Sequence, residues 1–239
     1  MLSIFISGLV KQSGKTLVTA GLAGTMQSLC YSTSVFKPVQ TNAVVVNDIP
    51  VSQDLQAINN IDSNIKTSAS YVFQSPLTPL VAAYVDNSKI DISKIYNDFQ
   101  ANITMTECHI VEGANSVFSP VDEHRTEADI IKSLGLPLLL VVNPKMSAIG
   151  DVIAGINFVK TEKLNLLGVI VNDYDENSEN LEEKYFPQLI KEYTDVNILG
   201  LIPHYDNAIQ LAPEVLIADI LNRVKVEEIF GLKIAKLNS

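Results

Sequence analysis

IFISGLVKQSGKT, residues 4–16, is an apolar run followed by a loop that ends in Gly-Lys-Thr. The apolar run predicts a buried strand, and the apolar spacing that follows predicts a helix over residues 15–30. A loop between a strand and a helix start presents backbone N–H groups and the positive end of the helix dipole, which together bind phosphate. Lys15 can then reach the β- and γ-phosphates, and the Thr16 hydroxyl can bind magnesium. The stretch therefore predicts a site for ATP with Mg²⁺.

The glycine spacing of this loop differs from its commonest form. The usual pattern places the first glycine at position 9, which is Leu9 here, whereas Gly8 comes one residue earlier. The strand before the loop and the helix after it still favour a phosphate-binding loop. The residues that we expect to contact the nucleotide are Gly8, Lys11, Gln12, Ser13, Gly14, Lys15 and Thr16.

Length and composition favour one domain. The chain has 239 residues, of which 47% are hydrophobic, enough for a full core. We expect a single α/β domain over residues 1–225 and a tail over residues 226–239 that is either packed on or flexible. The longest apolar stretch, residues 134–142, is too short to cross a bilayer, and the chain begins without a basic segment or cleavage site. These features predict a cytoplasmic protein without a membrane partner.

The net charge and the two cysteines argue against a nucleic-acid-binding protein, a cysteine-based metal site and a disulfide-rich fold. The formal net charge is −10, with acidic residues spread along the chain, so a groove for nucleic acid is not expected. Cys30 and Cys108 form neither a metal-binding spacing nor a disulfide framework, and we expect both to be small buried hydrophobic residues.

Short β-rich runs alternate with amphipathic stretches, which is typical of βαβ units. We therefore predict an α/β fold of the P-loop NTPase-like class, with a mostly parallel sheet and helices on both faces. The expected strands are residues 3–7, 34–39, 107–111, 138–143, 167–172 and 197–201. The expected helices are residues 15–30, 90–103, 147–160, 180–193 and 212–223. We expect residues 41–79 to be the least regular segment and residues 224–239 to add no strand.

Polar residues at the ends of the predicted strands are candidates for a site, because ligands of open parallel sheets bind outside the carboxyl ends of the strands. Lys37 lies at the carboxyl end of the second strand, and Glu112 follows a buried strand where P-loop proteins place a magnesium-binding or water-positioning group. Asn172 could bind a base edge. Taken alone, each could also be a solvated or structural residue, and Asp54 is uninformative by itself. The residues that we expect to be structural or solvated are His109, His124, His204 and Arg125.

Seven short motifs resemble, in order and spacing, those of the dethiobiotin synthetases, the ATP-dependent ligases of biotin synthesis. The family has five residues between its first glycine and Gly-Lys-Thr, which accounts for the early Gly8. The similarity extends over about residues 1–220. The matching motifs are residues 8–16, Lys37-Pro38-Val39, Asp54, residues 75–79, Val111-Glu112-Gly113-Ala114, Asn172-Asp173 and Gly200-Leu201-Ile202-Pro203.

The resemblance implies an enzyme that uses ATP and Mg²⁺ to close a ureido ring on 7,8-diaminononanoate with CO2. It also implies a homodimer that acts on small molecules. Lys15 and Lys37 would be catalytic and would stabilise charge around the γ-phosphate and a carbamate. The implied magnesium ligands are Thr16, Asp54 and Glu112. The implied adenine contacts are Asn172, Pro203 and His204, and the implied substrate contacts are Lys37, Thr41, Ile149 and Gly150.

The chain departs from the family pattern in the half of the site that binds the diamine. Lys11 and Gln12 stand where the family has a small hydroxyl residue and an acid. Asp151 lies near the start of the helix that meets the substrate carboxylate, and we expect it to cap that helix and repel the carboxylate. Two alternatives therefore stay open: a related ligase for another amine or acid, and a ParA/MinD-like ATPase switched by its nucleotide.

Overall fold

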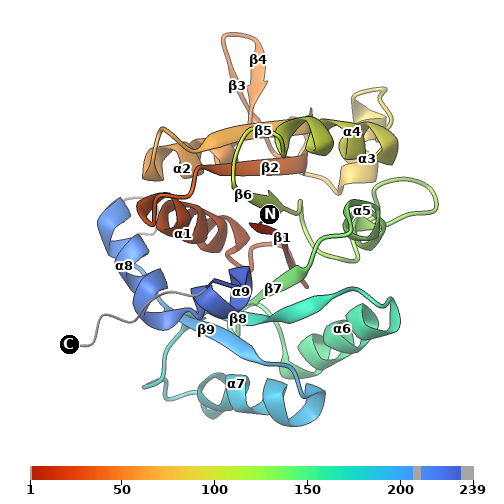
Figure 1. The fold of residues 1–239 in the computed structure, drawn as a ribbon. Helices are drawn as coiled ribbons and strands as arrows, with labels where there is room; N and C mark the ends of the chain where they lie inside the picture. The colour runs from red at the N-terminus through yellow and green to blue at the C-terminus, as the bar shows by residue number, and fades with distance from the viewer. Residues whose placement is uncertain (1, 207–210, 233–239) are drawn as a thin grey trace.

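A computed structural model describes residues 2–206 and 211–232 and has a seven-stranded parallel sheet between two layers of helices (Figure 1). The strand order is β5-β2-β6-β1-β7-β8-β9. The sheet consists of β1 (Leu2–Gly8), β2 (Thr33–Gln40), β5 (Lys66–Val72), β6 (Cys108–Glu112), β7 (Leu138–Val142), β8 (Leu166–Tyr174) and β9 (Ile198–Pro203). The helices are α1 (Lys15–Ser28), α2 (Gln53–Ile61), α3 (Pro79–Val85), α4 (Ile92–Asn102), α5 (Glu127–Leu134), α6 (Ile149–Thr161), α7 (Leu181–Thr194), α8 (Pro213–Arg223) and α9 (Val226–Phe230).

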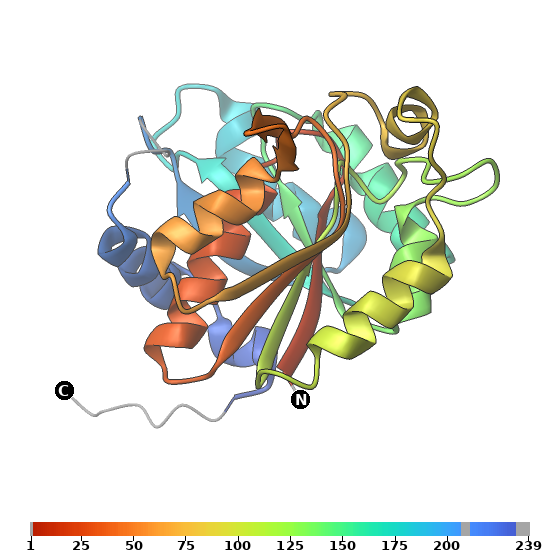
Figure 2. The same cartoon turned by 90° about the horizontal axis from the view of Figure 1, so that it is seen from above.

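The two layers bury opposite faces of the sheet. Successive residues of a strand point to opposite faces, so Val35 belongs to the apolar cluster that includes α1, α2, α8 and α9, whereas Phe36 belongs to the cluster that includes α4 to α7. Figure 2 shows α1 and α2 on one side of the sheet and α4 on the other. Because both faces are covered, the central strands are buried along their whole length, as β7 is. This burial explains the uninterrupted apolar runs of the sequence.

The phosphate loop, residues 8–16, follows the strand at the centre of the sheet. β1 lies in the centre, paired with β6 on one side and β7 on the other. The chain adds β2, β5 and β6 on one side of β1 and then β7, β8 and β9 on the other, so the strand order reverses beside β1, which opens a crevice at the carboxyl ends of the central strands. Ile6 of β1 is in register with Glu112 of β6, so the phosphate loop and Glu112 leave the sheet side by side. The predicted P-loop NTPase-like α/β fold is confirmed.

The segment expected to be irregular, residues 41–79, is ordered, and that expectation was wrong. It forms α2, β5 and a two-stranded hairpin of β3 (Val44–Val46) and β4 (Ile49–Val51), which projects from the body in Figure 1. β5 is an edge strand whose residues are mostly half-buried, so its sequence KTSASYV lacks the apolar run of a central strand. α3 and α5 were also not predicted.

Two further expectations concern the burial of the two cysteines and the carboxyl-terminal tail. Cys30 follows α1 and is exposed, so its expected burial was wrong, whereas Cys108 lies buried in β6. Residues 226–230 form α9, whose apolar side chains pack into the core, while residues 233–239 lie outside the described part of the chain. The boundary near residue 225 stays a prediction. Of the helices within residues 2–206 and 211–232, none has the length and apolar character that a membrane span requires.

Candidate functional site

The phosphate loop leaves the amino-terminal end of α1 open to a ligand. Gly14 is the N-cap of this 14-residue helix and has a φ of 91°, the left-handed conformation that favours glycine. Within the described residues no side chain caps the helix, and its first turn carries no acid. The first backbone N–H groups and the positive end of the helix dipole therefore face the crevice without a protein partner, as an anion requires.

The glycines of the loop are explained by close approaches of other side chains. A Cβ on Gly8 would overlap Oγ of Ser13, because the loop folds back over the end of β1. A Cβ on Gly14 would overlap the amide of Asn172, which donates a hydrogen bond of 3.3 Å to the carbonyl oxygen of Ser13. The loop therefore needs a glycine at position 8, one residue earlier than in its commonest form.

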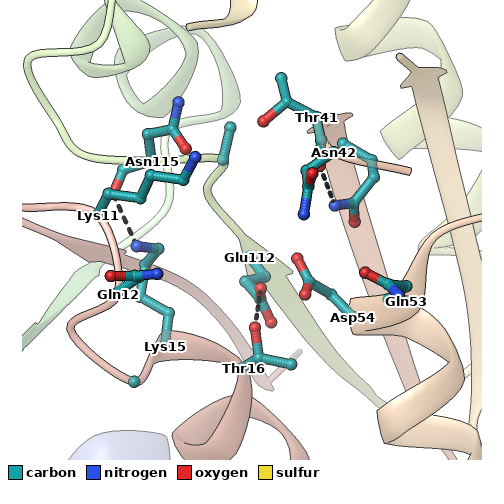
Figure 3. A pocket seen from close by; sticks show the side chains of 13 residues that line it. Lys11, Gln12, Lys15, Thr16, Thr41, Asn42, Gln53, Asp54, Glu112 and Asn115 are labelled. Carbon is teal, nitrogen blue, oxygen red and sulfur yellow. Dashed lines mark hydrogen bonds between the residues drawn. The ribbon is translucent and has the colours of Figure 1, made fainter. Parts of the chain in front are cut away.

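A polar cavity of about 280 Å³ opens above the loop (Figure 3). Its walls come from the phosphate loop, the end of β2, the start of α2 and the turn after β6. Of the residues predicted to bind nucleotide, metal or substrate, Lys11, Gln12, Gly14, Lys15, Thr16, Thr41, Asp54 and Glu112 line this cavity. The structure adds Gln40, Asn42, Gln53, Ala114 and Asn115 to its lining.

Lys37 lies behind the cavity lining, where it joins the two lining carboxylates, Asp54 and Glu112. Its Nζ atom lies 2.6 Å from Oδ2 of Asp54 and 2.6 Å from Oε1 of Glu112, and the Lys37 side chain is 1% exposed. Burial lowers the pKa of Lys37, but the two carboxylates outweigh it and hold that pKa above its ordinary value. For Asp54, burial raises the pKa and Lys37 outweighs it, so the pKa is lowered. Lys37 and Asp54 are therefore both charged at neutral pH.

Lys15 lies across the cavity from this cluster and is held by a backbone carbonyl. Its Nζ atom donates a 2.7 Å hydrogen bond to the carbonyl oxygen of Asn115. Burial lowers the pKa of Lys15, and the charge of Glu127 opposes this effect. In the described residues no carboxylate lies within salt-bridge distance of Lys15. A buried cation without an anionic partner is costly, so the site favours an anionic ligand beside Lys15.

The oxygen atoms around Glu112 fit a hard cation. Thr16 Oγ1 donates a 2.9 Å hydrogen bond to Oε1 of Glu112, and Oε2 of Glu112 is buried without a hydrogen-bond partner among the described residues. Figure 3 shows the Thr16–Glu112 bond with Asp54 beside it. A hydroxyl and two carboxylates are ligands of the kind that Mg²⁺ binds, together with waters and phosphate oxygens. No set of three His, Cys, Asp or Glu side chains within residues 2–206 and 211–232 forms a metal site by itself.

The residues predicted to contact adenine lie outside this cavity. Asn172 is buried behind the phosphate loop, and Pro203 ends β9. His204 is exposed, and its Nδ1 atom lies 2.6 Å from Oδ1 of Asp173, which also pairs with Lys145. This cluster is at the carboxyl ends of β8 and β9. A role for it in binding the base stays a prediction.

The start of α6 also lies apart from the cavity. Ile149 lines a separate hollow, and Gly150 is exposed. The expectation that Asp151 caps this helix was wrong, because α6 begins at Ile149 and Ala148 is its N-cap, without a side-chain cap bond. Asp151 is therefore the third residue of the helix.

One buried acid of this region, Glu127, was missed from the sequence. It is the first residue of α5, 2% exposed, and lies beneath the turn that follows Glu112. Burial raises its pKa, against hydrogen bonds and the charge of Lys15. Thr126 and Asp129 form a capping box, so their spacing was a signal for the helix start.

The sheet order and the phosphate loop define a P-loop α/β protein. The chain belongs to the AAA domain family, whose model matches residues 3–210.

Curated relatives confirm the resemblance to dethiobiotin synthetases. Three such relatives carry the name ATP-dependent dethiobiotin synthetase BioD. The chain is 25% identical to that of Thermodesulfovibrio yellowstonii over 84% of this chain and 88% of the relative. It is 26% identical to that of Bacillus velezensis over 87% and 88%, and 23% identical to that of Bacillus subtilis over 93% and 96%.

Solved structures with the same fold include cell-division proteins. The MinC:MinD complex of Aquifex aeolicus matches with a TM-score of 0.60 and 17% identity, covering 100% of this chain and 99% of that chain. The cell division ATPase MinD of Pyrococcus furiosus also matches with a TM-score of 0.60 and 17% identity, covering 98% and 100%. At this identity the likeness shows the fold alone.

Proposed function

We propose that this protein is an ATP-dependent ligase of the dethiobiotin synthetase type, which forms C–N bonds. The observation that carries the proposal is the convergence of Lys15, Asp54 and Glu112 on one cavity at the open end of α1, with Lys37 bound to both carboxylates behind the cavity lining. The relatives with this name match 84% to 93% of the chain. The family model, which matches residues 3–210, includes every residue that lines the cavity.

The phosphates of ATP would bind the phosphate loop. Backbone N–H groups at the start of α1 would receive them, and Lys15 would exchange the carbonyl oxygen of Asn115 for a phosphate oxygen. Magnesium would be held by Thr16, Asp54 and Glu112, where it would neutralise charge between the phosphates. For the base we propose Asn172, Pro203 and His204 at the ends of β8 and β9.

The chemistry that the family resemblance implies uses the two lysines as charge stabilisers. One amine of the substrate takes up CO2 and loses a proton, giving a carbamate. A carbamate oxygen attacks the γ-phosphorus of ATP, ADP leaves, and a mixed anhydride forms. The second amine attacks the carbonyl carbon, phosphate leaves, and the ureido ring closes. Lys15 would stabilise the transferred phosphoryl group, and Lys37, fixed between two carboxylates, would stabilise the carbamate.

We propose 7,8-diaminononanoate as the substrate and Thr41 as one of its contacts, since Thr41 lines the same cavity as Asp54 and Glu112. Ile149 and Gly150 do not line the cavity of their own chain. A contact from them to the substrate would therefore come from a second copy of the chain, as in a homodimer.

The test is turnover of ATP with bicarbonate and diaminononanoate, followed by ADP release and by the mass of the product. Turnover that requires both compounds supports the ligase. Lys37→Met, which removes the charge and keeps most of the volume, should abolish ring closure. Arg125→Ala is the matched control, because Arg125 is exposed and pairs with Asp122 away from the cavity. ATP turnover that ignores both compounds would contradict the proposal.

A nucleotide-switched ATPase of the MinD kind is the weaker alternative. The fold is consistent with it, but Lys11 lies one position away from the second lysine that this class typically has early in its loop. In this structure Lys11 donates a 3.1 Å hydrogen bond to the carbonyl oxygen of Pro76 in its own chain. ATP turnover stimulated by a protein or a membrane, and indifferent to the diamine, would favour the switch.

A further inference from the structure

Glu127 is a buried carboxylate that the proposed chemistry does not use. Both of its oxygens are bonded: Oε1 accepts from the hydroxyl of Ser7 at the end of β1, and Oε2 accepts from the backbone N–H of Ala114 at 2.7 Å. The carboxylate also fills the space above Gly113, where a Cβ would overlap it. A carboxylate with two fixed partners holds both of them in place, so Glu127 connects α5, β1 and the turn after β6.

The turn that Glu127 holds, residues 113–115, connects the two charged halves of the cavity. Glu112 precedes it and contacts Thr16 and Lys37, while the carbonyl oxygen of Asn115 ends it and accepts from Lys15. Backbone bonds support the same unit. Val117 donates to Gly8 at 3.0 Å, and the backbone N–H of Glu127 donates to Ser119 at 3.0 Å.

We propose that Glu127 is a positioning residue of this site, which fixes the turn after β6 and thereby the place of the Glu112 carboxylate beside Thr16. The proposal rests on the proposed nucleotide and magnesium site. Its reason is geometric. Without the carboxylate, the Ala114 N–H loses its buried acceptor and the space above Gly113 opens, so the turn can move. A shift of Glu112 weakens its contact to a metal ion more than it weakens the contacts of the loop to phosphate.

The experiment compares Glu127→Gln with Ser7→Ala by calorimetry of ADP binding, with Mg²⁺ and with EDTA. Glutamine keeps the volume but has one acceptor oxygen instead of two, so it cannot accept from both the Ser7 hydroxyl and the Ala114 N–H. We expect the ADP affinity of Glu127→Gln to fall about tenfold with Mg²⁺ and to stay within about twofold with EDTA. Ser7→Ala keeps the Ala114 bond, so its affinity should match wild type in both conditions.

Amide hydrogen exchange of Ala114 gives a second readout that needs no turnover. The Ala114 N–H should exchange faster in Glu127→Gln and at the wild-type rate in Ser7→Ala. If Glu127→Gln does not fold, Glu127→Asp replaces it, because a shorter side chain keeps the charge and cannot reach Ala114 while staying on α5.

Several results would overturn the proposal: wild-type ADP affinity of the variant with Mg²⁺, an equal loss with and without Mg²⁺, or an equal loss in Ser7→Ala. Failure of the ligase itself would show in the wild type, as no turnover with the diamine, while the binding and exchange results still decide the role of Glu127.

Discussion

The Nζ atom of Lys37 lies 2.6 Å from Oε1 of Glu112, and both side chains are 1% exposed. The same nitrogen meets Asp54, which is 31% exposed, at 2.6 Å. The Lys37 cation, on β2, thus lies between the carboxylate of Glu112 at the end of the neighbouring strand β6 and that of Asp54 at the start of α2. The Lys37–Glu112 pair connects β2 and β6, and Glu112 also lines the cavity, so a change of Glu112 should affect stability and metal binding together.

Glu112→Gln should therefore lower stability as well as magnesium binding. The change keeps the volume but leaves Lys37 with Asp54 as its charged partner, and the free energy of unfolding should fall by about 1–3 kcal/mol. Urea unfolding measures this loss, and a magnesium titration of ADP binding should shift to higher concentration. Asp54→Asn is the matched control, and its loss of stability should be smaller because Asp54 is partly solvated. Equal losses in the two variants would contradict this ranking.

Lys15→Ala should weaken ATP binding without weakening the fold. The side chain is buried, and its described partner is the carbonyl oxygen of Asn115, so the folded protein loses one hydrogen bond and one costly buried charge. ATP–magnesium affinity should fall by about 1.5–3 kcal/mol, the value of a charge-assisted contact to phosphate. Calorimetry gives the affinity. Lys11→Ala is the comparison, since Lys11 is exposed and its contacts are screened by water. Unchanged ATP–magnesium affinity in Lys15→Ala would contradict the assignment of residues 8–16 as a phosphate-binding loop.

The fold could be predicted where strands are buried on both faces. β7 consists of LLLVV, and such a run has no other stable place than the centre of a covered sheet. β5 could not be predicted, because an edge strand that is half-buried has no strong apolar pattern. α5 was not predicted, because it directly follows the charged turn of residues 122–125, although its capping box was a usable signal for a helix start.

The site could be predicted in part. Lys15 and Thr16 follow from the loop itself, and Lys37 and Glu112 follow from their places at strand ends. The position of Asp54 beside Lys37 depends on a 12-residue hairpin segment between β2 and α2, whose path the local pattern does not specify; the family resemblance supplied it. Glu127 and the turn that it holds depend on tertiary contacts across 120 residues, from Ser7 to Glu127, which no local pattern encodes.

The two cysteines should differ in their reaction with a thiol reagent. Cys30 is exposed at the end of α1, whereas Cys108 is buried in β6, where burial raises the pKa of its thiol to about 12. A thiol with a raised pKa stays protonated at every pH below that value, so Cys108 has almost no reactive thiolate between pH 7 and 9. One thiol should react in the native protein and two in denaturant. Cys30→Ser should abolish the native reaction, and rapid labelling of Cys108 in the folded protein would contradict its placement.

Gly14→Ala should damage the site more than a glycine replacement at the start of α6. At Gly14 the backbone φ is 91°, and a Cβ would overlap the amide of Asn172, so alanine must both strain the backbone and displace a side chain that holds Ser13. At Gly150 a Cβ meets nothing within 4 Å, and the residue lies in a helix, where alanine is favoured by about 0.5–1 kcal/mol. Thermal unfolding should therefore show a lower melting temperature for Gly14→Ala and an equal or higher one for Gly150→Ala. Calorimetry of Gly14→Ala at a temperature where it is folded should also show weaker ADP binding, because a displaced loop no longer aims its N–H groups at the phosphates. A Gly14→Ala variant with wild-type stability and ADP affinity would show that the N-cap of α1 tolerates a side chain. It would contradict the conclusion that the close approach of Asn172 requires a glycine at position 14.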